Sequence, residues 1–163
     1  MPTLILLRHG RSTANTAGVL AGRTPGVGLD ERGLAQAATL PRRLDGLPLA
    51  LAVSSPLQRC QETLAPLLAA RPGLELHTDD RLNECDYGAW AGLTDEPLME
   101  TVQRHPSAAA FPGGESLRTM AARAAEAVRE WNARVESAHG PDALYVMCSH
   151  GDKGFDDIAV GAH

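Results

Sequence analysis

Four short segments with strand character, separated by stretches with helical character, constrain the fold of this chain more than any other feature. They cover residues 4–7, 49–53, 74–77 and 143–148, and each is bounded by polar, glycine or proline residues. Short apolar runs between such breakers are typical of strands buried in a parallel sheet. Their alternation with helices predicts βα units and an α/β fold, a three-layer sandwich with a mostly parallel central sheet flanked by helices.

Capping and breaking residues place the expected helices. We expect helices over residues 30–44, from Ser55-Pro56 to about residue 68, over 96–105 and over 115–139, and loops over 10–28 and 83–93. Asp30 is an N-cap candidate, Ser55 is a cap followed by proline, and Pro41 interrupts the first helix. With 163 residues, the chain is expected to form one domain, residues 1–163.

Net charge and cysteine content limit which classes of binding partner and which cellular compartment we expect for this chain. The formal net charge of −5 argues against nucleic acid or an anionic membrane as the main partner. The three cysteines are an odd number without a CxxC pair, which disfavours a disulfide framework and favours the reducing cytoplasm. No apolar stretch approaches the roughly 20 residues that a membrane-spanning helix needs, and the N-terminus is a poor signal peptide.

Histidine and arginine residues follow the strands at the points where ligands bind in parallel sheets. Arg8-His9-Gly10 comes after the first strand, Ser149-His150-Gly151 after the fourth, and Arg59 lies on the helix after the second. We expect these ends to converge on one crevice. Arginine matches phosphate oxygens with bidentate donors, and backbone N–H groups of a helix beginning at Ser55-Pro56 would add to them.

A neutral imidazole beside arginines can attack phosphorus, because nearby positive charge lowers its pKa. His9 is therefore the expected nucleophile. A carboxylic acid, usually one with a raised pKa, must protonate the leaving oxygen. Glu84, in a glycine-containing loop after the third strand, is the first choice, and Asp86 is its rival.

The histidine, arginine and cysteine residues also allow other interpretations. A zinc site is the rival for paired histidines, but no His-x-x-Glu-His or Cys/His cluster supports it and the arginines would repel a cation. Arg11, Arg23, Arg32 and Arg42 are expected to be solvated or to face substrate. Cys60 and Cys148 are expected to be buried apolar groups, whereas Cys85, beside Glu84, could be accessible.

Several ordered motifs resemble the histidine phosphatase superfamily, the phosphoglycerate-mutase-like proteins. They are Leu7-Arg8-His9-Gly10-Arg11-Ser12-Thr13-Ala14-Asn15, the helix segment from Leu29 to Ala37, Ser54-Ser55-Pro56-Leu57-Gln58-Arg59, Leu82-Asn83-Glu84-Cys85-Asp86-Tyr87-Gly88, Phe111-Pro112-Gly113-Gly114-Glu115-Ser116 and Ser149-His150-Gly151-Asp152. The set covers roughly residues 3–152. Residues 21–27 and 103–107 are most similar to an actinobacterial group of probable phosphomutases or acid phosphatases.

The resemblance implies a role for each matching residue. It makes His9 the nucleophile, assigns Arg8, Arg59 and His150 to the phosphate pocket and supports Glu84 as proton donor. Asn15 matches a position that borders the phosphate, and Ser12 and Thr24 are further candidates for phosphate or substrate binding. No metal and no cofactor are expected, and a homodimer is compatible with the family.

The expected function is metal-independent hydrolysis of a small phosphorylated metabolite through a phosphohistidine intermediate. The alternatives are a cofactor-dependent phosphoglycerate-type phosphomutase and a weakly active phosphate-binding module. The segment after the acid loop, between Gly92 and Pro97, is short for this group, which favours the phosphatase. After residue 152 the sequence departs from the apolar helix and strand usual in the family, so this part is expected to be atypical or incomplete.

Overall fold

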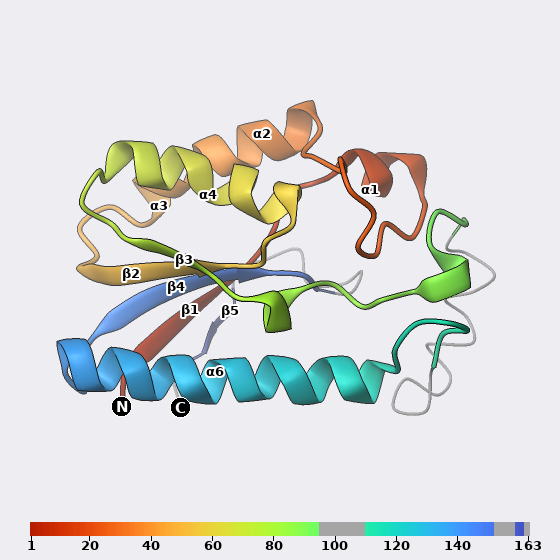
Figure 1. Ribbon diagram of the computed structural model, residues 1–163. Helices are drawn as coiled ribbons and strands as arrows, with labels where there is room; N and C mark the ends of the chain where they lie inside the picture. Colours follow the sequence, from red (N-terminus) through yellow and green to blue (C-terminus); the bar gives the residue numbers. More distant parts are fainter. Residues whose placement is uncertain (95–109, 152–158, 162–163) are drawn as a thin grey trace.

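A five-stranded sheet forms the middle layer of the computed structural model, which describes residues 1–94, 110–151 and 159–161 (Figure 1). The strands are β1 (Thr3–Arg8), β2 (Leu49–Ser54), β3 (Leu76–Thr78), β4 (Leu144–Ser149) and β5 (Ala159–Gly161), in the order β3-β2-β4-β1-β5. The pairs β1–β4, β2–β4 and β2–β3 are parallel, and β5 pairs with β1 antiparallel. The expected mostly parallel α/β sandwich is confirmed.

Helices cover both faces of the sheet. On one face lie α2 (Glu31–Ala38), α3 (Leu40–Arg43) and α4 (Gln58–Ala70), and on the other lies the long α6 (Leu117–His139) (Figure 1). The short helices α1 (Thr13–Ala17), η1 (Asp80–Leu82) and η2 (Gly88–Trp90) lie in the connections beyond the strand ends.

Each buried strand contributes side chains to two hydrophobic cores, one on each face of the sheet, because successive side chains point to opposite faces. In β4, Val146 and Cys148 pack toward α4, whereas Tyr145 and Met147 pack toward α6. Trp131 of α6 fills the second core. Continuous apolar runs are therefore required here, and they are the reason that the strands could be located in the sequence.

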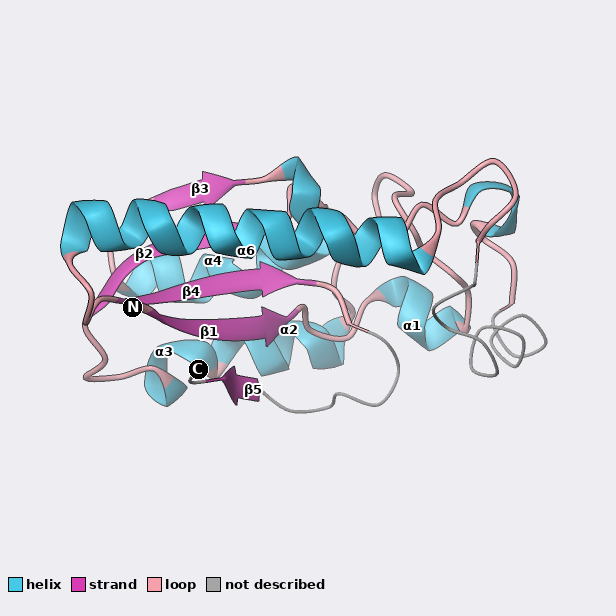
Figure 2. Cartoon of the chain, turned by 90° about the horizontal axis from the view of Figure 1, so that it is seen from below, coloured by secondary structure: helices cyan, strands magenta, loops and turns pink. Residues whose placement is uncertain are grey.

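The order of the strands places a crevice at their carboxyl ends. The chain passes from β1 to β2 and β3 with helices on one face, and α6 then returns it on the other face to β4, between β1 and β2. In Figure 2, β1, β3 and β4 point the same way. Ligands bind beyond the carboxyl ends of strands in such sheets, and here these are the ends of β1 and β4.

Close packing of α2 against the segment after β1 depends on a glycine. A Cβ atom added to Gly33 would lie 2.0 Å from the carbonyl oxygen of Arg11, a distance that real contacts do not allow. Gly33 is at the start of α2, where Asp30 caps the helix by accepting from its N–H at 2.8 Å. The helix can therefore rest directly on the backbone that leads out of the first strand.

Several expected boundaries were wrong. Helix α4 begins at Gln58 and its N-cap is Leu57 rather than Ser55; the Ser55 hydroxyl accepts from Leu57 N–H at 3.3 Å and contacts His150 and Asn83. Residues 10–28, expected as a loop, contain α1, which Ser12 and Asn15 cap reciprocally. Residues 83–93 likewise contain η2.

Of the other expectations for the helices and the C-terminal part, one is confirmed and two concern residues that the structure does not describe. The interruption expected at Pro41 is confirmed, since α2 ends at Ala38 and α3 begins at Leu40. The helix expected over 96–105 lies outside the described residues, as does the segment 152–158, and β5 was not expected. None of the helices in the described ranges has the length and apolar character of a membrane span.

The packing predicts a contrast between two leucines. Leu64 of α4 is fully buried in the core between α4 and the sheet, whereas Leu34 of α2 is 53% exposed. Leu64→Ala should lower the free energy of unfolding by about 2–5 kcal/mol, because it leaves a cavity. Leu34→Ala should change it by about 0.5 kcal/mol or less. Urea denaturation followed by circular dichroism measures both, and equal losses would contradict this assignment of the core.

Candidate functional site

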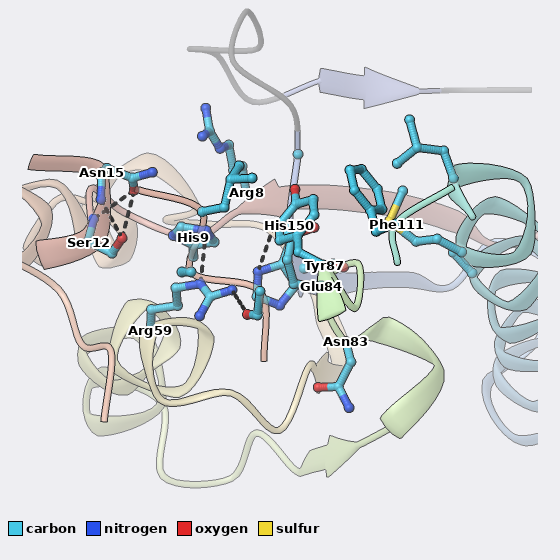
Figure 3. Close-up of a pocket in the computed structure, with 18 of the residues that line it drawn as sticks. Arg8, His9, Ser12, Asn15, Arg59, Asn83, Glu84, Tyr87, Phe111 and His150 are labelled. Carbon is cyan, nitrogen blue, oxygen red and sulfur yellow. Dashed lines mark hydrogen bonds and ion pairs between the residues drawn. The ribbon is translucent and has the colours of Figure 1, made fainter. Parts of the chain in front are cut away.

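A pocket of about 220 Å³ lies beyond the carboxyl ends of β1 and β4 (Figure 3). Its polar side is lined by Arg8 and His9 from the end of β1, Arg59 from α4, Glu84 from the loop after η1, and His150 after β4. These five residues were all expected at the site. The structure thus brings together side chains that are up to 142 residues apart in the chain.

His9 is held as a neutral imidazole with a defined tautomer. Its Nδ1 lies 2.7 Å from the carbonyl oxygen of Gly10, which can only accept, so Nδ1 carries the hydrogen. Its Nε2 accepts from Nε of Arg59 at 3.3 Å. Burial lowers the pKa of His9 to about 4; the bond to Gly10 opposes this shift, and the charges of Arg59 and Arg8 add to it. The Nε2 lone pair is therefore available at neutral pH.

Helix α4 carries Arg59 into the pocket and fixes the backbone beside His9. Arg59 is only 1% exposed, and its Nη2 donates to the carbonyl of Gly22 at 3.0 Å. One turn later, the hydroxyl of Thr63 accepts from Gly10 N–H at 2.9 Å and donates to the carbonyl of Arg59 at 2.7 Å. A single helix thus sets the position of both the guanidinium and the chain next to the imidazole.

The ring of His150 lies beside that of His9, with centroids 5.1 Å apart and ring planes tilted by 59°. Its Nε2 faces two groups that can donate a hydrogen, the hydroxyl of Ser55 at 2.9 Å and the thiol of Cys60 at 3.6 Å. Burial, followed by the charge of Arg59, lowers the pKa of His150 well below its usual value, so this ring is also neutral.

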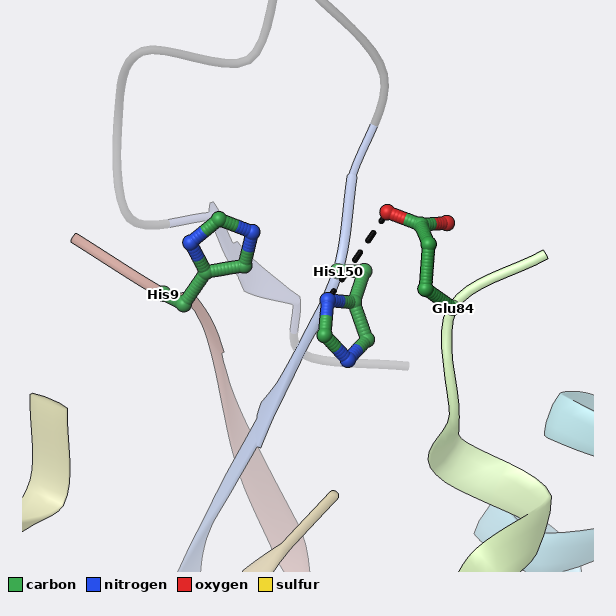
Figure 4. A group of neighbouring side chains, drawn as sticks. All are labelled: His9, Glu84 and His150. Carbon is green, nitrogen blue, oxygen red and sulfur yellow. Dashed lines mark ion pairs between the residues drawn. The ribbon is translucent and has the colours of Figure 1, made fainter. Parts of the chain in front are cut away.

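Glu84 faces the same space from the opposite wall (Figure 4). Its Oε1 accepts from the N–H of Cys85 at 2.9 Å, and its Oε2 lies 3.7 Å from Nδ1 of His150, too far for a hydrogen bond. The Oε2 atom is thus the carboxyl oxygen directed at the histidines. Asp86, the rival acid, does not line the pocket, and its Oδ1 accepts from Gly88 N–H instead.

Three buried nitrogen atoms around the pocket lack a hydrogen-bond partner within the described part of the chain. They are Nε of Arg8, Nη1 of Arg59 and Nδ1 of His150. Buried donors are nearly always satisfied, and an unsatisfied one costs free energy. All three residues line the same pocket, and two of the nitrogen atoms belong to guanidinium groups, which suit an anion with several oxygen atoms, as phosphate has.

The two histidines and the glutamate at this site are residue types that can also bind a metal ion. One nitrogen from each of His9 and His150 and one oxygen from Glu84 lie within 4.8 Å of one another. These are zinc-type ligands. However, the guanidinium groups of Arg8 and Arg59 line the same pocket, and their positive charge opposes a cation. The charge of the site therefore favours a bound anion.

Of the other residues that the sequence assigned to the site, some line the pocket and others do not. Ser12 and Asn15 line the pocket, but their side chains bind each other, with Ser12 Oγ donating to Asn15 Oδ1 at 2.9 Å. Thr24 is exposed and is not among the lining residues. Ser55 and Pro56, where the helix was expected to begin and to contribute backbone N–H groups, do not line the pocket, and of the first turn of α4 only Arg59 does.

Sequence reasoning missed the apolar wall and the groups that support the acid loop. Val19, Leu20, Tyr87, Phe111, Leu117 and Met120 line the outer part of the pocket. The i, i+3 spacing of Leu117 and Met120 was a signal for one face of a helix. Arg23, expected to be solvated or to face substrate, is exposed, and its side chain also pairs with Glu115 at 2.9 Å.

Cys85, the cysteine considered accessible, is fully buried, and burial is the main reason that its pKa is raised to about 12. It packs with Phe111 in a small cluster of their own. The three cysteines are all free and buried. The sequence expectation for Cys60 and Cys148 is therefore confirmed, and that for Cys85 is wrong because the loop folds back onto its own apolar residues.

Comparison with known proteins agrees with this geometry. Residues 4–153 match the model of the histidine phosphatase superfamily, branch 1. The chain is 38% identical over 133 residues to the 2,3-bisphosphoglycerate-dependent phosphoglycerate mutase of Brucella ovis and 37% identical to that of Bartonella quintana; each match covers 74% of this chain. The chain spans only 64% of the length of these curated relatives.

Two solved structures with the same fold are described as phosphatases. A mycobacterial glucosyl-3-phosphoglycerate phosphatase aligns with a TM-score of 0.76 and 33% identity, over 91% of this chain and 73% of that one. A putative alpha-ribazole-5'-P phosphatase from Escherichia coli aligns with a TM-score of 0.72 and 29% identity, over 90% and 72%. With the match of the family model over residues 4–153, these similarities establish that the chain belongs to the histidine phosphatase superfamily.

Proposed function

We propose that this protein hydrolyses phosphomonoesters of small metabolites, with His9 as the nucleophile. The observation that carries the proposal is the unprotonated Nε2 of His9 in a pocket with three buried nitrogen atoms, two of them guanidinium donors, that have no partner among the described residues. A phosphoryl group bound to those donors would lie against the lone pair of Nε2. Arg8, Arg59 and His150 are then the phosphate-binding residues.

In the first step, Nε2 of His9 attacks phosphorus and the bond from phosphorus to the leaving oxygen breaks. Glu84, entering as the carboxylic acid, gives its proton to that oxygen, and the alcohol departs. In the second step, the Glu84 carboxylate takes a proton from water as the water oxygen attacks phosphorus, and the bond between phosphorus and Nε2 of His9 breaks, which releases phosphate and restores the lone pair of His9 and the carboxylic acid of Glu84. The arginines offset charge on the phosphoryl oxygens throughout. No metal ion takes part in this scheme.

Glu84 is the better acid of the two carboxyl groups near the site. Its Oε2 is directed at the histidines, whereas Asp86 contributes to the fold of its own loop. Ser12 and Asn15 would border the phosphate, with Ser12 acting through the position of Asn15. Thr24 could reach only a part of the substrate that extends beyond the pocket, since it does not line it.

The phosphomutase alternative rests on the names of the curated relatives. Arg81 is the third guanidinium group lining the described pocket, but it is paired with Asp79 and Glu130 at 2.7 Å each. The described part of the pocket therefore offers its outer substrate region a largely apolar wall, which favours hydrolysis over the retention of a phosphorylated acid. A cytoplasmic location, a homodimer and the absence of nucleic-acid and membrane partners stay predictions.

Replacing His9 tests the proposal directly. His9→Ala should reduce kcat on p-nitrophenyl phosphate by on the order of 10³-fold or more, because it removes the nucleophile. His139→Ala is the matched control, since His139 is exposed at the end of α6. Turnover should be measured with EDTA present, and activity that survives His9→Ala or requires an added metal would contradict the mechanism. A folded protein that turns over nothing in a phosphoester panel would favour the binding module.

The reaction class can be separated by product analysis. With 3-phosphoglycerate, a phosphatase releases inorganic phosphate, whereas a mutase forms 2-phosphoglycerate, most rapidly when 2,3-bisphosphoglycerate is added. We expect phosphate release to be faster than isomerisation under both conditions. ³¹P NMR of the reaction mixture follows both products, and isomerisation that is faster than phosphate release would reverse the assignment.

The lowered pKa of His9 predicts how the free enzyme responds to acid. A histidine with the ordinary value of about 6.5 is mostly protonated at pH 5, whereas His9, with a pKa of about 4, stays neutral there. The contribution of His9 to kcat/KM should thus persist at pH 5 and be lost as the pH falls through 4. ¹⁵N NMR of the ring should show the Nε2 signal of a neutral ring at pH 5.5, with the urea-unfolded protein as control. Titration of His9 near 6.5 in the folded protein would refute the assignment.

A further inference from the structure

A cluster of charged side chains outside the pocket holds the loop that carries Glu84. Arg123, on α6, donates from Nη1 to the carbonyl oxygens of Arg81 at 2.7 Å and Asn83 at 2.6 Å. Its Nη2 donates to the carbonyl of Glu84 at 3.0 Å. One guanidinium group thus binds three carbonyl groups within four consecutive residues, so it fixes the path of the backbone up to the acid.

Glu115 links this arginine to a second one. Its carboxylate accepts from Nε of Arg123 at 3.1 Å, from Nη2 of Arg23 at 2.9 Å and from the backbone N–H of Asp86 at 3.1 Å. Arg23 also donates from Nε to the carbonyl of Glu84 at 3.2 Å. Burial opposes ionisation of Glu115, yet the hydrogen bonds from Arg123 and Asp86 outweigh it and hold its pKa below the usual value. The charged carboxylate is therefore shared by two guanidinium groups that both bind the carbonyl of the acid residue.

The backbone after Glu84 is fixed from the same side. Glu115 N–H donates to the carbonyl of Asp86 at 2.9 Å, and Ala89 N–H donates to the carbonyl of Pro112 at 2.9 Å. A Cβ atom on Gly114 would lie 2.0 Å from the carbonyl oxygen of Asp86, so only glycine allows this approach. The glycine-rich turn before α6 is thus the second support of the acid loop.

We propose that Arg123 and Glu115 are positioning residues for proton transfer by Glu84. Neither lines the pocket, and both bind backbone groups within two residues of that side chain. The inference rests on the proposed function of Glu84. Misplacement of a reacting group by about 1 Å can cost on the order of 10²-fold in rate, so loosening this loop should impair the step that needs the acid.

The dependence of the rate on the leaving group separates positioning from general damage. A phenolate such as p-nitrophenolate leaves readily without a proton, whereas an alkoxide needs one. Arg123→Gln should therefore lower kcat/KM for an alkyl phosphate such as glycerol 2-phosphate by on the order of 10²-fold, but that for p-nitrophenyl phosphate by less than about 5-fold. Arg129→Gln, an exposed change on the same helix, should alter neither rate.

Glu84→Gln and the double variant test whether Arg123 acts through the acid. Glu84→Gln should show the same selective loss, and adding Arg123→Gln to it should lower the alkyl phosphate rate by less than about 3-fold more, because acid function is already absent. Equal losses on both substrates in Arg123→Gln, or additive losses in the double variant, would overturn the inference while leaving the proposed function intact. A Glu84→Gln protein without leaving-group selectivity would overturn the acid assignment and, with it, this inference.

Glu115→Gln provides the same test with a smaller change, should Arg123→Gln not fold. It keeps the shape of the side chain and removes the charge shared by Arg23 and Arg123, so it should show the same selectivity between substrates with a smaller loss. Thermal unfolding of each variant establishes that the assayed protein is folded. An unaltered ratio of the two rates in folded Glu115→Gln would also overturn the inference.

Discussion

The contact between the buried guanidinium of Arg59 and Nε2 of His9 is possible only while that imidazole is neutral, because two buried cations would otherwise face each other. The carbonyl of Gly10 on the other ring nitrogen fixes the tautomer. The arginine thus does two things at once: its charge adds to the effect of burial, which keeps His9 unprotonated, and it adds a donor toward the pocket. Displacement of Arg59 by an incoming phosphoryl oxygen would free Nε2 to attack.

The fold supplies this contact through two features that need not be near each other in the sequence. The parallel pairing of β1 with β4 brings His9 and His150 together at adjacent strand ends. Helix α4 packs across the sheet and delivers Arg59, and its Thr63 binds the backbone of Gly10 one turn later. The acid comes from the opposite layer, where α6 holds the loop of Glu84 through Arg123. Each helix layer therefore positions one side of the same reaction.

Much of this arrangement could be predicted from the sequence, and what could not has a common cause. Apolar runs locate the strands, and the rule for strand ends brings together His9 and His150; Arg59 follows from its motif. The choice between Glu84 and Asp86 depended on which side chain turns into the pocket, and that is decided by contacts of the loop with Glu115 and Gly88. Local pattern could not reveal such long-range pairing, which also explains why the pairing of Arg23 with Glu115 was missed and why the expectations for Cys85 and the start of α4 were wrong.

The central claim is that a neutral His9 becomes phosphorylated during turnover. Rapid mixing of the enzyme with p-nitrophenyl phosphate, followed by quenching in alkali, which preserves phosphohistidine, and peptide mass spectrometry would locate the phosphoryl group. The account predicts one phosphoryl group on His9, formed and lost at rates that match turnover, and none in His9→Ala. A phosphoryl group on another residue, or full turnover with no phosphorylated enzyme at any time, would contradict it.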